Sequence, residues 1–170
     1  MSNVKKTVIS ALCVAMCVVL PMAFHAIPGA GKVCSPMHIP VLLCGLLCGP
    51  LYGLLCGIAG TTLSTLVTTM LSAADMPCML AELAVYGLVT GGMMRLVRTG
   101  KKYLAVYASL LTAMLSGRVF AGILMALFFA QGSYSIKLWI MSYFIISWPG
   151  IVIHLILVPT VYFAVKKSTL

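Results

Sequence analysis

Three ionisable residues stand inside long apolar stretches of this chain: Glu82, Arg118 and His154. Ionisable side chains are costly in hydrocarbon, so those found there are interpreted first as parts of a pathway or a binding site. At 1.5 Å per helical residue, we expect Glu82 roughly 8 Å below the outer end of its helix. Arg118 is expected roughly 22 Å above the inner end of its helix, again in the outer half. His154 is expected farther down its helix, toward the cytoplasm.

Glu82 and Arg118 therefore share a depth, and two interpretations stay open. The two side chains neutralise each other in the bundle, or they line a pocket that faces outward. An arginine offers planar paired donors that match a carboxylate or a phosphate, so the pocket interpretation predicts a ligand with an anionic group. We interpret His154 as hydrogen-bonded to the backbone of a neighbouring helix.

Other polar and aromatic residues are expected at the same level. Tyr86 follows Glu82 by four positions and shares its helix face. His38 opens the second apolar segment, either as part of the pocket or as a solvated helix start. Trp139 and Tyr143 begin the last segment, where aromatic side chains commonly anchor a helix at the membrane interface. The candidate substrate-binding residues are His38, Glu82, Tyr86, Arg118 and Tyr143.

The motifs of several enzyme classes are missing from the sequence. It has no G-x-x-x-x-G-K-[ST] loop and no acidic pair for Mg²⁺, so the chain itself is not expected to hydrolyse ATP. A lipid-acting enzyme would use Glu82 and His38 as base and acid, but neither H-E-x-x-H nor a second intramembrane carboxylate is present. We therefore expect no catalytic residues and no cofactor.

The seven cysteines do not follow a metal-binding pattern. Zinc sites commonly use C-x2-C pairs, and the chain has none, so no metal site is expected. Most of the cysteines lie in apolar helices, where a thiol behaves as a small hydrophobic group. Cys34 and Cys78 are expected near the outer face, and whether they pair is left open.

A ladder of glycines links the second and third apolar segments: Gly45, Gly49, Gly53 and Gly57. Small residues four apart allow helices in lipid to approach closely, so we interpret all four as helix-packing residues. Pro50 interrupts the ladder, and proline suits the first turn of a helix. A short helix therefore ends near Gly49, and a new one begins at Pro50.

The composition requires a membrane. The chain is 62% hydrophobic and 8% charged, with a mean hydropathy of +1.16, whereas soluble domains carry about 25% charged residues. We expect an all-α integral membrane protein with one domain over residues 1–170 and six transmembrane helices in a compact bundle. The expected spans are Thr7–Phe24, a short His38–Cys48, Pro50–Ser72, Pro77–Leu96, Tyr103–Ala130 and Leu138–Val165.

The basic residues predict the orientation of these spans. Eight of the eleven fall on one side: Lys5, Lys6, Arg95, Arg98, Lys101, Lys102, Lys166 and Lys167. Lys32 and Lys137 fall on the other side. The positive-inside rule then places both termini in the cytoplasm. The net charge of +9 is thus a topology signal and not the mark of a nucleic-acid-binding surface.

The chain resembles the substrate-binding S components of energy-coupling factor (ECF) vitamin transporters. The resemblance rests on the A-x-x-x-A of Ala11 and Ala15, the segment from His38 to Pro50, E-L-A-V-Y-G from Glu82, S-G-R-V-F-A-G around Arg118, and P-G-I-V-I-H-L-I-L-V-P from Pro149. It implies that Ala11 and Ala15 contact a shared transmembrane coupling subunit that two ATPase subunits drive. It also implies a bacterial plasma membrane location and a vitamin held under the outer loops. The generic and pantothenate-type branches are the most similar.

Other function classes remain as alternatives. The chain lacks the internal repeat of many secondary transporters, so energy comes from partners or transport runs downhill. A stand-alone small-molecule permease is the first alternative, and a small intramembrane enzyme is the second.

Overall fold

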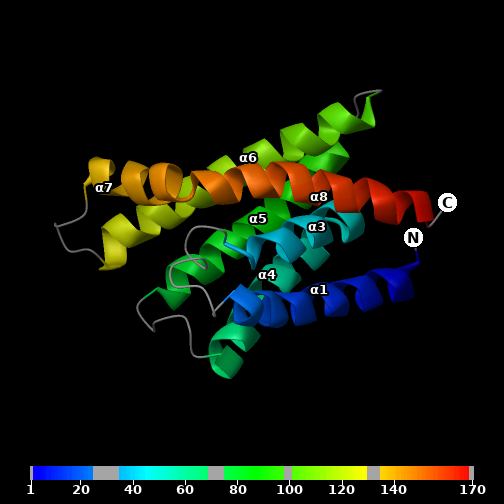
Figure 1. The fold of residues 1–170 in the computed structure, drawn as a ribbon, viewed down its shortest axis with the longest axis horizontal. Coiled ribbons are helices and arrows are strands. Elements are labelled where there is room, and N and C mark those ends of the chain that lie inside the picture. The colour runs from blue at the N-terminus through cyan, green and yellow to red at the C-terminus, as the bar shows by residue number, and fades with distance from the viewer. Residues whose placement is uncertain (1, 25–34, 69–74, 98–100, 130–134, 169–170) are drawn as a thin grey trace.

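The computed structural model describes residues 2–24, 35–68, 75–97, 101–129 and 135–168, and within these residues every regular element is helical. The order is α1 (Asn3–Phe24), α3 (His38–Cys48), α4 (Pro50–Thr68), α5 (Met76–Leu96), α6 (Lys102–Leu124), α7 (Ile136–Ile140) and α8 (Trp148–Ser168) (Figure 1). Two π-helical segments, η1 (Met125–Phe129) and η2 (Met141–Ile146), continue α6 and α7. The predicted all-helical membrane fold is confirmed.

Five of the described helices are long and apolar enough to cross a membrane: α1, α4, α5, α6 and α8. The short second segment was predicted at His38–Cys48, and α3 has those bounds. The other helices begin within a few residues of the predicted positions. The predicted ends at Ser72 and Ala130 lie outside the described residues. α1 begins and α8 ends at the same end of the bundle, as the predicted topology requires (Figure 1).

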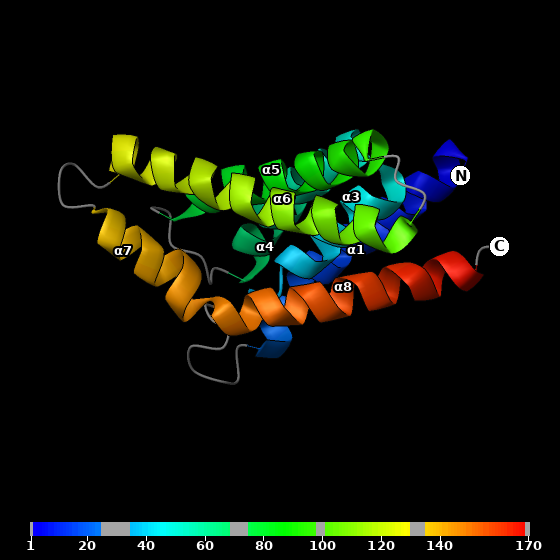
Figure 2. The same ribbon diagram turned by 90° about the horizontal axis from the view of Figure 1, so that it is seen from above.

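The predicted last span is divided in two. Leu138–Val165 was expected as one helix, but α7 and η2 end at Ile146, and α8 starts at Trp148. Pro149 favours this break, because proline has no backbone N–H to continue the helical hydrogen bonds from η2 and suits the first turn of a new helix, here α8. The α7–η2 piece leaves the line of α8 and runs toward the end of α6 (Figure 2). This bend brings η2 over the polar cluster described below.

α3 occupies the middle of the bundle and is buried on almost every side. It packs on α1, α4, α5 and α8, while the most extensive contacts in the fold join α5 to α4 and α6. Its eleven residues are too few to cross a bilayer core of about 30 Å. α1, by contrast, buries only a small part of its apolar surface in the chain.

The glycine ladder lies between α3, α4 and α5. A Cβ atom added at Gly45 would lie 2.7 Å from the Gly87 carbonyl oxygen, and one at Gly57 would lie 2.5 Å from that of Leu83. Gly53 likewise contacts the backbone of Gly87. α5 supplies glycines of its own to this contact, Gly87 and Gly91, which were not among the predicted packing residues. At Gly49, φ is +101°, so a left-handed backbone ends α3 directly before Pro50.

Candidate functional site

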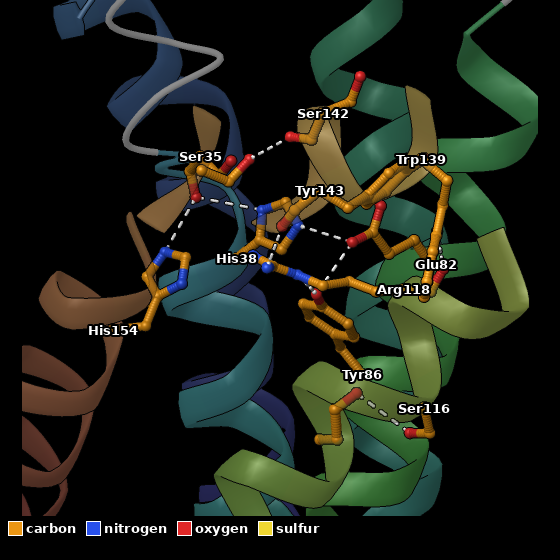
Figure 3. A network of polar contacts seen from close by, with 12 residues as sticks. Ser35, His38, Glu82, Tyr86, Ser116, Arg118, Trp139, Ser142, Tyr143 and His154 are labelled. Atoms are coloured by element: carbon orange, nitrogen blue, oxygen red, sulfur yellow. Dashed lines mark hydrogen bonds and ion pairs between the residues drawn. The ribbon is translucent and has the colours of Figure 1, made fainter. Parts of the chain in front are cut away.

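A cluster of buried polar side chains lies where α3, α5, α6 and η2 meet, and α8 joins it from the side (Figure 3). It contains His38, Glu82, Tyr86, Arg118 and His154, each at most 6% exposed. The side chains of the first four point toward one another (Figure 3). Buried polar groups in an apolar bundle are stable only when they are hydrogen-bonded, so the contacts within the cluster determine its chemistry.

Glu82 of α5 is contacted through one carboxylate oxygen. The Tyr86 hydroxyl donates a hydrogen bond of 2.9 Å to Oε1, across one turn of the same helix. Nε2 of His38 lies 3.6 Å from the same oxygen. The other oxygen, Oε2, has no hydrogen bond within the described residues.

Arg118 of α6 reaches the same tyrosine from the opposite side. Its Nε donates to the Tyr86 hydroxyl at 3.1 Å, and its Nη1 donates to the backbone carbonyl of Tyr143 in η2. The guanidinium carbon lies 5.5 Å from the centre of the Phe144 ring, at the distance of a cation–π contact. Nη2 makes no hydrogen bond within the described part of the chain.

Glu82 and Arg118 are not direct partners. Within the described residues, no nitrogen of Arg118 lies within 4.0 Å of a Glu82 oxygen, and the Tyr86 hydroxyl stands between them. Simple mutual neutralisation would give a paired carboxylate and guanidinium. The structure instead holds the two charges in one buried cluster, bridged by a neutral hydroxyl.

The two histidines meet at one carbonyl oxygen. Nδ1 of His38 lies 3.1 Å, and Nε2 of His154 3.3 Å, from the carbonyl oxygen of Ser35. A carbonyl oxygen only accepts, so each ring donates to it through that nitrogen. The imidazole rings stack, with centroids 5.6 Å apart. Ser35 has a φ of +44°, which is uncommon for a residue with a Cβ atom.

The structure corrects one expectation about these histidines and decides between two alternatives for the other. His154 was expected deep toward the cytoplasm, but the break before Trp148 places it only six residues into α8, where it contacts His38. A hydrogen bond to the backbone of a neighbouring helix was expected; the bond that is present goes to the Ser35 carbonyl, which lies before α3 and outside any helix. His38 is not a solvated helix start, because it is 4% exposed.

Trp139 and Tyr143 are half-buried. Both contact Arg118, Trp139 through its indole and Tyr143 through its backbone and not its side chain. The Trp139 indole donates to the Arg118 carbonyl at 3.2 Å. The backbone carbonyl of Tyr143 accepts a hydrogen bond from the Arg118 guanidinium. Ser35 and Phe144 were not predicted. Ser35 joins through its backbone carbonyl, which leaves no signal in side-chain chemistry. Phe144 joins through its ring, which is one of many aromatic rings in the apolar sequence. The adjacent glycine in S-G-R was a usable signal for close packing beside Arg118.

The remaining predicted residues lie away from this cluster. Ala11 and Ala15 are exposed on one face of α1. The cysteines of the described helices are free and buried, and no group of three or more metal-ligating side chains occurs among the described residues. Cys78 has a free thiol 3.8 Å from the Met125 sulfur, and Cys34 lies outside the described residues.

Residues 5–162 match the model of a protein family described as the ECF transporter, substrate-specific component. The matched range runs from the first turns of α1 to the last turns of α8 and includes every residue of the polar cluster. Among curated proteins and among solved structures, nothing matches the chain.

Proposed function

We propose a function for this chain from one premise: the chain belongs to the ECF transporter family, as a substrate-specific component. It is therefore a multi-pass membrane protein and the substrate-binding subunit of a micronutrient uptake system, a class of transport component and not of enzyme. Within that class, we propose that it binds a small anionic vitamin of the pantothenate type at the polar cluster. We place it in the bacterial plasma membrane, with a shared coupling subunit and two ATPase subunits as partners.

One observation carries the ligand assignment: Arg118 is a buried cation without a carboxylate partner within 4.0 Å in the described residues. Leaving a charge buried is expensive unless hydrogen bonds and an opposite charge compensate it. The hydroxyl of Tyr86 and the carbonyl of Tyr143 give Arg118 two neutral acceptors. A carboxylate on the ligand would supply the missing negative charge.

The surroundings of Arg118 suit a small organic anion. Nη2 makes no hydrogen bond to the described residues, and a second hydrogen bond from it would give the paired geometry that a guanidinium forms with a carboxylate. Phe144 and Trp139 provide aromatic surface beside it, and pockets for small molecules combine apolar walls with a few such polar groups. His38 and Glu82 extend the polar surface toward α3 and α5.

The proposed coupling surface is on α1. Ala11 and Ala15 form a flat strip of small residues on a helix that buries little of its surface in this chain. Small side chains allow another helix to approach closely in lipid, where hydrophobic burial does not drive association. We infer that this strip receives a helix of the coupling subunit.

Titration of purified variants with pantothenate tests the ligand assignment. Arg118→Ala should weaken binding by about 10-fold or more, since hydrogen bonds to charged groups contribute about 1.5–3 kcal/mol. Arg118→Lys should restore only part of the loss, because lysine keeps the charge but not the paired donors. Arg95→Ala, at an exposed position near the other end of α5, is the matched control. Wild-type affinity in the double variant Arg118→Met with Glu82→Leu would contradict the proposal.

Extraction of the bound ligand provides an independent test. The subunit is expressed with its coupling and ATPase subunits, purified, and denatured, and the released small molecules are identified by mass spectrometry. We expect a compound with a carboxylate or phosphate. A cationic or uncharged compound in its place would contradict the assignment to Arg118.

A further inference from the structure

The Tyr86 hydroxyl is the only hydrogen-bonded bridge between Glu82 and Arg118 in the described residues. It donates to the glutamate and accepts from the arginine, at 2.9 Å and 3.1 Å. Both charged groups are nearly fully buried. In a medium of low dielectric constant, opposite charges this near would gain most by closing into a direct pair. Their separation therefore needs a physical cause.

The cause is the locked position of the tyrosine ring. Tyr86 is fully buried, and its ring fills the space beside Gly117 that a side chain at that position would occupy. On its other side, the His38 ring meets it edge-on, with centroids 5.0 Å apart. Packed between α3 and α6, the ring cannot swing away without displacing a helix.

We propose that Tyr86 is a positioning residue, which keeps Glu82 and Arg118 apart as two separate poles of the binding site. The consequence for substrate class rests on the proposed function: the ligand carries an anionic group for Arg118 and, some distance away, a hydrogen-bond donor for Glu82. A hydroxyl at the end of the ligand remote from the anionic group would serve as that donor, because an ionised carboxylate only accepts. A fatty or aromatic acid without a hydroxyl would bind Arg118 through its carboxylate but would offer no hydrogen-bond donor to Glu82.

The positioning role is tested first without any ligand, by melting curves in detergent. In Tyr86→Phe, the arginine is free to close on Glu82, so adding Arg118→Met then removes a direct ion pair and leaves the buried carboxylate with its His38 contact alone. We expect Arg118→Met to lower the melting temperature by about 3 °C more in the Tyr86→Phe background than in the wild type. If Tyr86 is only one more hydrogen-bond partner, the arginine has already lost a contact in Tyr86→Phe. Arg118→Met would then lower the melting temperature in the Tyr86→Phe background by the same amount as in the wild type or by less, and this outcome would overturn the proposal.

The ligand class is tested with a matched pair of compounds. Pantothenate carries a carboxylate, an amide and two hydroxyls, whereas its dideoxy analogue keeps the carboxylate and the amide and lacks only the two hydroxyls. We expect wild type to bind pantothenate about 10-fold more tightly, as for one hydrogen bond to a charged group, and Glu82→Gln to remove most of that difference. Tyr86→Phe should weaken pantothenate binding about 10-fold, while Tyr162→Phe, a buried tyrosine bonded to Lys166 outside the cluster, should not.

The outcomes separate this inference from the proposed function. Equal affinity for the two compounds would overturn the two-pole assignment and leave anion binding intact. Binding of neither compound would count against the pantothenate-type ligand, while the melting curves still decide the role of Tyr86.

Discussion

The Tyr86 ring on α5 lies where a side chain of residue 117 on α6 would project, so Gly117 and Tyr86 fit together across the helix interface. The same two helices share one of the most extensive contacts of the fold. Gly117 also directly precedes Arg118 in the chain. The α5–α6 interface therefore fixes the positions of both the Tyr86 ring and the Arg118 guanidinium that donates to its hydroxyl. Helix packing and the geometry of the binding site are therefore linked at this pair.

Gly117→Ala should disturb both properties. Its Cβ atom would meet the tyrosine ring, and overpacking in a close-packed interior costs about 1–3 kcal/mol. We expect a loss of melting temperature of about 2–4 °C per kcal/mol together with weaker ligand binding. Gly92→Ala is the control, because a Cβ atom there meets nothing within 4 Å. If Gly117→Ala and Gly92→Ala melt alike, the fit between residues 86 and 117 does not constrain the fold.

The glycine ladder should tolerate no large side chain where α4 meets α5. Gly53→Leu and Gly57→Leu would each place a side chain against α5 backbone and force the helices apart. We expect each variant to melt at clearly lower temperature in detergent, or to fail to accumulate. Gly92→Leu on α5 provides the comparison. Unchanged melting of both ladder variants would mean that these positions do not need close packing.

A bulky residue on the exposed face of α1 should separate binding from assembly. Ala15→Trp, or Ala11→Trp, blocks close approach of a partner helix but touches no residue of the polar cluster. Ligand titration of the isolated subunit should be unchanged, while co-purification with the coupling subunit and uptake in cells should fall. Leu115→Trp, on the exposed face of α6, should affect neither. Lost ligand binding in Ala15→Trp with normal assembly would contradict the assignment.

His154 should stabilise the fold through its hydrogen bond to Ser35. His154→Phe keeps a ring beside His38 but removes the donor, and leaves the Ser35 carbonyl with one histidine instead of two. We expect a loss of about 1–3 kcal/mol, the usual cost of disrupting a buried hydrogen bond. Differential scanning fluorimetry measures it against Thr160→Ala, an exposed position on the same helix whose hydroxyl bonds only within α8. Equal melting of the two variants would show that this contact adds nothing.

The extents of most helices could be read from the sequence, because local chemistry sets them. Apolar length, Pro50 and Gly49 placed the boundary between α3 and α4, and α3 was predicted with its observed bounds. The membrane character followed from composition. The candidate residues His38, Glu82, Tyr86 and Arg118 could be named as well, since charged and polar side chains stand out in apolar helices.

The contacts between those residues were decided by the tertiary structure. Periodicity predicts that Tyr86 shares a face with Glu82, but it does not say which atoms of α6 reach that face, because helix rotation and tilt depend on packing between helices. The insertion of Tyr86 between Glu82 and Arg118 depends on the space beside Gly117. The break between η2 and α8 moved His154 beside His38 and brought the Tyr143 carbonyl to Arg118. Sequence spacing determined which residues lie in the membrane, and only the packing of five helices determined which of them touch.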